Sequence, residues 1–334
     1  MCVLQHIHFM YTLFRHIIGA FSGQILNILV PGVKVEVVAL LITPDIQILP
    51  FKYNDGIKYF ELFAEPVKRE ILPGLFIQAW GYNGTTPGPT IQVYSGDYVS
   101  IRVHNRLEES TSIHWHGLDV PNMMDGVPDA EPSPLIKPGK FLDYRFRVNN
   151  HPGTHMYHTH TNSAKQEMMG LGGAFIVMDP NEYGIDRDYF LMLQEFKVND
   201  LKTGEIRQGS FEIDPMSHDF NFFTINGRCF PFTSPLPVNY GDIVRIRMGN
   251  MVHDAHPVHI HGHQFAVVAT DGNILTSSQR YLKNTLNIAS GETYDVVFKA
   301  NNPGVWPFHC HIPHHMSNNM LQSMGGMFTT IVYQ

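Results

Sequence analysis

The sequence predicts an all-β protein with two sandwich-like domains, and three observations support this class. Short segments of alternating apolar and polar residues stand between turns rich in glycine, proline and asparagine. No long segment carries apolar residues at the 3.6-residue spacing of an amphipathic helix. The two halves of the chain also repeat each other's glycine and histidine motifs in the same order, which indicates two homologous domains.

Three strands are expected in the first half, each directly after a turn signal. They are residues 90–93 (TIQV) after TPGP, residues 97–103 (DYVSIRV) after SG, and residues 141–148 (FLDYRFRV) after KPGK. Every second residue in VSIRV and YRFRV is apolar. One face of each strand should therefore pack on a core, and the other should be polar.

Two further strands are expected in the second half. They are residues 242–248 (DIVRIRM) after YG and residues 293–300 (TYDVVFKA) after SGE. The alternation in VRIRM is the same as in the first half and predicts a half-buried strand with its arginines on the polar face.

The internal repeat sets the expected domain boundaries. Gly241-Asp242 repeats Gly96-Asp97, and GVWPFH near the end of the chain repeats GTHMYH in the first half with a slightly larger offset, as one loop insertion would produce. The predicted domains are residues 57–180 and 187–334, joined near Pro180 and Asn181, with residues 1–56 as an N-terminal extension.

Composition excludes several classes of protein. Hydrophobic residues make up 43% and charged residues 16% of the 334 residues, which is enough apolar surface for packed cores. The net charge of −7 and the absence of a long basic run argue against nucleic-acid binding. No unbroken run of about 18 apolar residues occurs, so no membrane span is expected. Residues 1–24 are apolar but interrupted by three histidines, which makes them a weak secretory signal.

The chain has 20 histidines, and eight of them form four His-X-His pairs. Residues i and i+2 of a strand face the same side, so each pair presents two imidazoles together. If domains of the two kinds meet face to face, eight imidazoles converge, which suits a cluster of several copper ions better than one zinc ion. The pairs are His114/His116 and His158/His160 in the first domain, and His259/His261 and His309/His311 in the second.

Cys310 stands between the two histidines of the last pair, so its side chain should point to the opposite face, into its own domain. Two histidines, one cysteine and a long axial methionine form the blue-copper electron-transfer site. His256, His315 and Met320 are the expected partners of Cys310. The first domain should lack this site, because the repeat places Thr111, Thr159 and Ala164 at the equivalent positions, and only Met320 keeps a counterpart, Met169.

The motifs HWHG, HTH, HPVHIHGH and HCHIPHHMSNNM resemble the four copper-binding signatures of multicopper oxidases, the laccase superfamily. The order of the motifs, with the cysteine in the second domain, is similar to the two-domain laccases, and the resemblance covers residues 57–334. It implies two cupredoxin-like Greek-key β-sandwich domains.

The resemblance also implies a role for each ligand. Asp125 in MDGV matches an acid that relays protons to dioxygen, although an Asp-Gly turn would also account for it. Two departures are Asn319 where many members have glycine, and Met316 where some have a second acid. Type 2 copper would be bound by His114 and His259, the type 3 pair by His116, His158, His160, His261, His309 and His311, and type 1 copper by His256, Cys310, His315 and Met320.

The implied function is that of an oxidoreductase with dioxygen as acceptor. One-electron oxidation of a phenol, an aromatic amine or a metal ion at the type 1 copper would feed the four-electron reduction of dioxygen to water. His315 or His256 would pass the electron to the copper, and Cys310 would conduct it onward. Two-domain relatives place the cluster between domain one of one subunit and domain two of the next, which implies a homotrimer. The family also favours a periplasmic or secreted location.

Two rival functions remain open. A copper nitrite reductase would have its cysteine in the first domain and no type 3 pair, so Thr159 and the eight paired histidines argue against it. A non-catalytic copper-binding or copper-tolerance protein is the other, and the 16 methionines could serve a copper-loading surface because thioethers bind Cu(I). The sequence does not choose among the electron donors.

Overall fold

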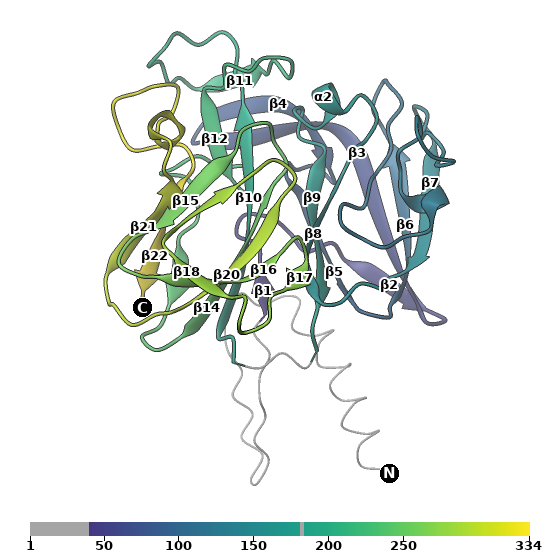
Figure 1. The fold of residues 1–334 in the computed structure, drawn as a ribbon. Coiled ribbons are helices and arrows are strands. Elements are labelled where there is room, and N and C mark those ends of the chain that lie inside the picture. The colour runs from purple at the N-terminus through teal and green to yellow at the C-terminus, as the bar shows by residue number, and fades with distance from the viewer. Residues whose placement is uncertain (1–39, 181–183) are drawn as a thin grey trace, which may run out of the picture. The chain divides into compact units, whose positions relative to one another are not determined.

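The computed structural model describes residues 40–180 and 184–334 (Figure 1). The regular secondary structure of this part of the chain is almost wholly β-strand, which confirms the predicted all-β class. Its one α-helix, α2 (Ser163–Gln166), is a single short turn, and no helix here is long and apolar enough to cross a membrane. The apolar segment 1–24, most of the predicted extension and Asn181 of the predicted joint lie outside the described residues.

The first half of the chain forms two sheets whose side chains share one core. Buried Trp115, Tyr144 and Phe175 are among the largest residues of that core. The smaller sheet has the order β5-β9-β8, with β5 (Gly88–Tyr94), β8 (Gly153–His158) and β9 (Gly172–Met178). The larger has the order β11-β4-β3-β6-β7, with β2 on β3; its strands are β2 (Phe51–Asn54), β3 (Ile57–Leu72), β4 (Leu75–Tyr82), β6 (Tyr98–Asn105), β7 (Phe141–Arg147) and β11 (Gly209–Glu212).

The second half also forms two sheets around a shared core, which contains Phe308, Cys310 and Met327. The five-stranded sheet has the order β13-β22-β21-β15-β19, with β13 (Leu236–Val238), β15 (His256–Ile260), β19 (Thr285–Ile288), β21 (Val305–Cys310) and β22 (Phe328–Tyr333). The other has the order β1-β10-β14-β20-β16-β17, with β12 on β10 and β18 on β16; its strands are β1 (Leu41–Ile42), β10 (Arg187–Phe196), β12 (Phe222–Ile225), β14 (Ile243–Asn250), β16 (Phe265–Thr270), β17 (Asn273–Ile274), β18 (Tyr281–Lys283) and β20 (Thr293–Lys299).

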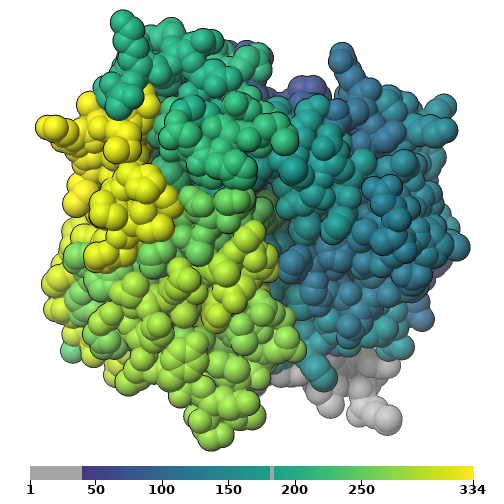
Figure 2. Space-filling model, turned by 45° about the horizontal axis from the view of Figure 1, so that its top comes forward, coloured from purple at the N-terminus to yellow at the C-terminus, as the bar shows by residue number. Residues whose placement is uncertain are grey.

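Each half contributes a strand to the other half's sheet. β1, from the predicted extension, pairs in parallel with β10, with Leu41 opposite Asp188. β11, from the predicted second domain, pairs in parallel with β4, with Gly209 opposite Leu75. Figure 2 shows the two halves, blue to teal and green to yellow, in contact along a broad boundary. These strand exchanges have no local signal in the sequence.

The five expected strands all occur, as β5, β6, β7, β14 and β20. The expected alternation holds in β6, where Ile101 and Val103 are buried and Arg102 is partly exposed. It is wrong for β14, because Arg245 and Arg247 are both buried. The reason is that β14 contacts β8 of the first half, so the face expected to be polar and solvated is covered.

A buried charge network compensates the two arginines. Arg245 reaches Asp188 at 2.6 Å, and Arg247 reaches Asp188 at 3.0 Å and Asp295 at 3.2 Å. Thr154 of β8 donates to Asp295 (2.6 Å) and accepts from Arg247 (2.9 Å), so the network joins the two halves. Burial alone would raise the pKa of Asp188, but the guanidinium groups of Arg247 and Arg245 outweigh it and lower that pKa.

We expect the Asp188→Asn variant to lose about 3–5 kcal/mol of unfolding free energy, because it leaves two buried guanidinium groups without their shared carboxylate. Asp188 has a lower pKa in the folded than in the unfolded chain, so its contribution is complete above the unfolded pKa. It is lost as the pH falls through the folded pKa. The difference between wild type and variant, measured by urea denaturation, should therefore shrink in acid.

Asp143→Asn is the matched control, because Asp143 pairs with Arg102 on the surface of the first half (2.6 Å). Exposed ion pairs contribute little to stability, so this variant should unfold close to wild type. Equal losses in the two variants would contradict the role assigned to the buried network.

Candidate functional site

Four histidines of the first half lie together and form the first quartet: His114, His116, His158 and His160. Hydrogen bonds from the His114 N–H to the His158 carbonyl (2.7 Å) and back (3.1 Å) fasten the loop with the first pair to the end of β8. Neighbouring ring centroids lie between 5.3 and 6.2 Å apart. Nδ1 of His116 is 3.1 Å from Nε2 of His158, a spacing that a shared metal ion can bridge.

The second quartet is built in the same way from His259, His261, His309 and His311. β15 and β21 pair so that His259 stands opposite His309. Ring centroids lie between 4.8 and 5.8 Å apart, and Nε2 of His261 is 3.0 Å from Nε2 of His309. The structure thus brings together each set of four histidines that the repeat predicted.

Backbone carbonyls orient three of these rings. Nδ1 of His158 and of His309 each lies 2.8 Å from the carbonyl oxygen of the next residue, and Nδ1 of His259 lies 2.7 Å from that of Asn284. A carbonyl only accepts, so Nδ1 carries the proton in each ring. Nε2 is left with a free lone pair, as a metal-binding imidazole needs.

The electrostatics of the quartets favour neutral imidazoles. Burial, reinforced by His158 and His114, lowers the pKa of His116 to about 4, and burial also lowers the pKa of His309. His158 differs: burial opposes its charge, but Glu167, 3.3 Å from its Nδ1, raises its pKa. Neutral rings at physiological pH are competent ligands.

Asp125 lies beside the first quartet, as the sequence predicted. It follows the 3-10 turn Asn122–Met124, and its Oδ2 is 3.3 Å from Nδ1 of His114. The His114 Nδ1 also lies 3.1 Å from the Asp125 carbonyl oxygen. One carboxylate oxygen and the backbone oxygen of Asp125 therefore face the same ring. A carboxylate in this place can hold and pass a proton.

Among the described residues, no ring contact joins the first quartet to the second. A cavity of about 260 Å³ beside the first quartet is lined by Met156, Glu167 and Met251 in addition to the four histidines. His160 and His311, the last members of each quartet, are exposed. Each quartet is therefore open to solvent on one side within a single chain.

Cys310 forms a buried triad with His256 and His315. Its Sγ lies 3.9 Å from Nδ1 of His256 and 3.6 Å from Nδ1 of His315, and these two nitrogens are 3.2 Å apart. All three side chains are at most 1% exposed. Strand alternation turns Cys310 inward while His309 and His311 join the second quartet, as the sequence predicted.

Burial keeps this triad uncharged. It lowers the pKa of His256 to about 3 and, with His256 and His314 nearby, that of His315 to about 3. It raises the pKa of the Cys310 thiol to about 12. A bound metal ion would offset the effect of burial on the Cys310 thiol, because a thiol that coordinates a metal is deprotonated.

The equivalent place in the first half is filled by hydrogen bonds. Thr111 Oγ1 and Thr159 Oγ1 lie 3.3 Å apart, and both donate to Oε1 of buried Gln166 at 2.8 Å. Within residues 40–180 and 184–334, the one metal-capable group that contains a cysteine is the triad of the second half.

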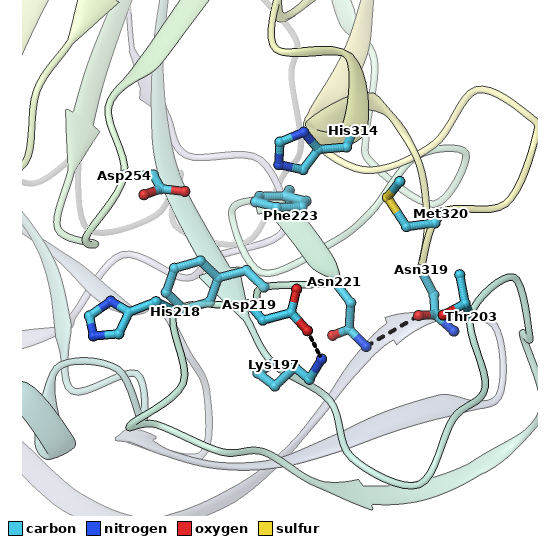
Figure 3. A pocket seen from close by; sticks show the side chains of 11 residues that line it. Lys197, Thr203, His218, Asp219, Asn221, Phe223, Asp254, His314, Asn319 and Met320 are labelled. Carbon is cyan, nitrogen blue, oxygen red and sulfur yellow. Dashed lines mark hydrogen bonds and ion pairs between the residues drawn. The ribbon is translucent and has the colours of Figure 1, made fainter.

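The two methionines near the triad differ in environment. Met320, the expected axial ligand, is 54% exposed and lines an open cavity with Asn319 and His314 (Figure 3). Met327 is fully buried in the core that contains Cys310. Its carbonyl accepts the Cys310 N–H (3.0 Å), and its own N–H donates to the His315 carbonyl (2.8 Å). Sequence spacing missed Met327, although its position directly before the strand-forming segment FTTIV was a signal of burial.

Two carboxylates face the outer sides of the triad, and sequence reasoning missed both. Glu195 Oε2 of β10 lies 3.6 Å from Nε2 of His256, and Asp254 Oδ2 lies 3.8 Å from Nε2 of His315. Burial raises the pKa of Glu195 to about 8. Phe223 of β12 stacks on His315, with ring centroids 3.8 Å apart. No motif marks these residues, because they come from segments distant in sequence.

Comparison with known proteins places these groups in context. Two family models, both described as multicopper oxidase, match residues 65–182 and 202–325. The multicopper oxidase mco of Staphylococcus aureus is 26% identical over 81% of this chain and 89% of its own length. A probable nitrite reductase-hydroxylamine oxidoreductase fusion protein of Kuenenia stuttgartiensis is 32% identical over 83% of this chain, which spans only 32% of that protein. The blue copper oxidase from Nitrosomonas europaea superimposes with a TM-score of 0.73 at 31% identity, covering 82% of this chain and 85% of that one.

Proposed function

This chain belongs to the multicopper oxidase family, and we propose that it couples one-electron oxidation of a reducing substrate to four-electron reduction of dioxygen to water. The observation that carries the proposal is the buried Cys310 triad, whose cysteine is the covalent neighbour of two histidines of the second quartet. The triad, which would accept single electrons, is thereby joined through peptide bonds to the second quartet, where electrons would be collected.

The residues fit the copper centres of this family. The thiol and two Nδ1 atoms of the triad match a type 1 site, and the quartets, in which His158, His259 and His309 leave Nε2 free, match the type 2 and type 3 sites. Bound copper would supply the one-electron steps and the activation of dioxygen. The chain would hold the ligands in place, keep water from the triad by burial, and lead the electron from His315 through Cys310 to His309 and His311.

We assign proton handling to the carboxylate of Asp125. Reduction of dioxygen to water consumes four protons, so the cluster needs a group that returns them. Asp125 Oδ2, 3.3 Å from Nδ1 of His114, is placed to hold one beside the first quartet. Glu167, 3.3 Å from Nδ1 of His158, is a second carboxylate beside the first quartet.

We propose that the active form is a homotrimer in which the first quartet of one subunit meets the second quartet of the next. Each quartet is open on one side, and four imidazoles alone cannot hold three copper ions as eight can. Light scattering on the copper-loaded protein tests the assembly. A monomer with full oxidase activity would contradict it.

We also propose a periplasmic or secreted location, which rests on resemblance to the family. Fractionation of the native cells, followed by detection of the protein in each fraction, tests this. Detection in the cytoplasmic fraction alone would overturn it.

The visible absorption spectrum of the copper-loaded protein, oxidised and then reduced, tests the proposed activity. An intense blue band that bleaches on reduction and returns with air, together with dioxygen uptake, supports an oxidase. A colourless protein that binds copper without consuming dioxygen would instead favour the copper-binding alternative.

The arrangement of side chains in the first half argues against the nitrite reductase alternative. There Thr111, Thr159 and Gln166 form a closed hydrogen-bonded cluster where that enzyme would need its cysteine site. Nitrite consumption by the copper-loaded protein, with no dioxygen uptake, would reverse this assignment.

For the axial position of the type 1 site we propose Met327, because it is buried in the same core as Cys310. The Met327→Leu variant should have a higher reduction potential and a shifted visible band, because a thioether that favours oxidised copper is lost. Met320→Leu is the matched control and should leave both unchanged, since its side chain is 54% exposed. A redox titration followed in the visible range distinguishes the two methionines. If Met320→Leu changed the potential and Met327→Leu did not, the axial ligand would be Met320, the residue that the sequence predicted.

A further inference from the structure

The cavity of about 260 Å³ beside the first quartet is enclosed by residues from both halves of one chain. In addition to the histidines, the first half supplies Met156 and Glu167, and the second half supplies Met251 and a turn with Ser290 and Gly291. A Cβ atom at Gly291 would lie 3.4 Å from Cε1 of His116, so this turn packs against the quartet. The cavity is therefore formed within a single chain, before any contact between subunits.

Strand alternation directs Met156 into this cavity. β8 ends at His158, and Thr154, Met156 and His158 share one of its faces because every second residue of a strand points the same way. Thr154 on that face donates a hydrogen bond to Asp295 of the second half (2.6 Å). Met156 thus projects toward the second half, two residues before a histidine of the quartet.

Two glycines leave the space that the sulfur atoms of Met156 and Met251 occupy. A Cβ atom at Gly249 would lie 2.9 Å from Sδ of Met156, and one at Gly172 would overlap Sδ and the methyl group of Met251. Neither glycine has the left-handed backbone that would require it, and glycine inside a strand often marks a close approach. Gly172 of β9 is the pairing partner of His158, so the Met251 sulfur lies over the strand pair that holds this ligand.

The cavity brings two thioethers next to four imidazoles. Thioether sulfur is a soft ligand that favours Cu(I), and imidazole is also a good copper ligand. Both methionines belong to a buried core that includes Leu41, Ile176 and Phe190. The Born cost of burying an ion increases with the square of its charge, so these surroundings favour Cu(I) over Cu(II). Glu167, the carboxylate of the lining, lies 3.3 Å from Nδ1 of His158 and is engaged there.

We propose that Met156 and Met251 form an entry site that captures Cu(I) and passes it to the first quartet. The transfer is a ligand exchange, in which copper–sulfur bonds break as copper–nitrogen bonds to the imidazoles form. The ion stays Cu(I), so no electron, proton or further reactant is needed. The inference concerns loading of the chain and not turnover, and it rests only on the binding of copper by the quartet.

Sulfur ligation is measured by X-ray absorption on the metal-free, full-length protein after one equivalent of Cu(I) has been added without air. Cys310→Ser is present in every sample, because the thiol of the triad would otherwise bind the same ion. We expect two Cu–S contacts with both methionines present, one in Met156→Leu or Met251→Leu, and none when both are leucine. Leucine is apolar and of similar size, so the packing of the core is preserved.

The matched control replaces Met178 and Met192 by leucine. Both side chains pack in the same core as the proposed entry site, but among the described residues neither lines the cavity. This control should keep both Cu–S contacts and its affinity for Cu(I). The double variant Met156→Leu/Met251→Leu should bind Cu(I) at least about 10-fold more weakly in competition with bicinchoninate.

The rate of loading separates an entry site from a packing role. With Cys310 intact, loading of the metal-free double variant from Cu(I) should be at least about 10-fold slower than in wild type, while loading from Cu(II) should be unchanged. The loaded variant should then have the blue band and the dioxygen uptake of the wild type. Equal slowing with both ions, or Cu–S contacts that survive in the double variant, would overturn the proposal. A wild-type chain that binds Cu(I) through both thioethers but takes up no dioxygen would overturn the oxidase function and leave the entry site standing.

Discussion

The Cys310→Ser variant should lose its visible absorption band and its dioxygen uptake together. The triad Sγ lies within 4 Å of both histidine Nδ1 atoms, and a buried serine hydroxyl does not ionise to replace a thiolate. Loss of a residue that only orients a metal ligand costs roughly 10–100-fold in metal affinity or activity, so loss of this ligand should exceed that range. Copper analysis with spectroscopy and an oxygen electrode measures both effects.

Cys229→Ser is the matched control, because Cys229 is also fully buried but belongs to a different core cluster. Burial raises the pKa of its thiol, and it belongs to none of the metal-capable groups within the described residues. This variant should keep the colour and the turnover of the wild type. If the Cys310→Ser variant kept full oxygen uptake, the triad would not lie on the path of the electrons.

Mixing two inactive variants should restore activity if the cluster forms between subunits. His116→Ala damages the first quartet and His261→Ala damages the second, so each variant alone assembles only defective clusters. In randomly mixed trimers, roughly a quarter of the interfaces would combine an intact first quartet with an intact second quartet. Dioxygen uptake after co-refolding in equal amounts should therefore recover to about that fraction of wild type.

The control for this experiment mixes His116→Ala with His160→Ala. Both changes lie in the first quartet, so no arrangement of these subunits yields an intact cluster. This mixture should stay inactive. No recovery in the first mixture, with mixed trimers shown to be present by mass spectrometry, would mean that the quartets do not meet across subunits.

The features that the sequence predicted are those with a local geometric cause. A strand places residues i and i+2 on one side, so alternation alone assigns His309 and His311 to one face and Cys310 to the other. The repeat then transferred the same argument to the first half and identified Thr159 as a position without a metal ligand. Membership of the multicopper oxidase family, expected from four motifs, is confirmed.

What the sequence missed depends on contacts between distant segments. Glu195 lies on β10 and reaches His256 of β15, and nothing near either residue in sequence indicates this. Arg247 was expected on a solvated face, but the neighbouring half covers that face and binds the arginine through Thr154. Met320 satisfied a spacing rule, whereas the structure buries Met327 in the core with Cys310.

The pairing of β11 with β4 has a consequence for synthesis of the protein. On the ribosome, residues 57–180 emerge before residues 209–212, so the outer edge of β4 has no partner during that interval. An open strand edge is a site for pairing between nascent chains. The first half can therefore complete its sheet only after about two thirds of the chain has been translated. Production of that half alone would leave the edge permanently available for aggregation.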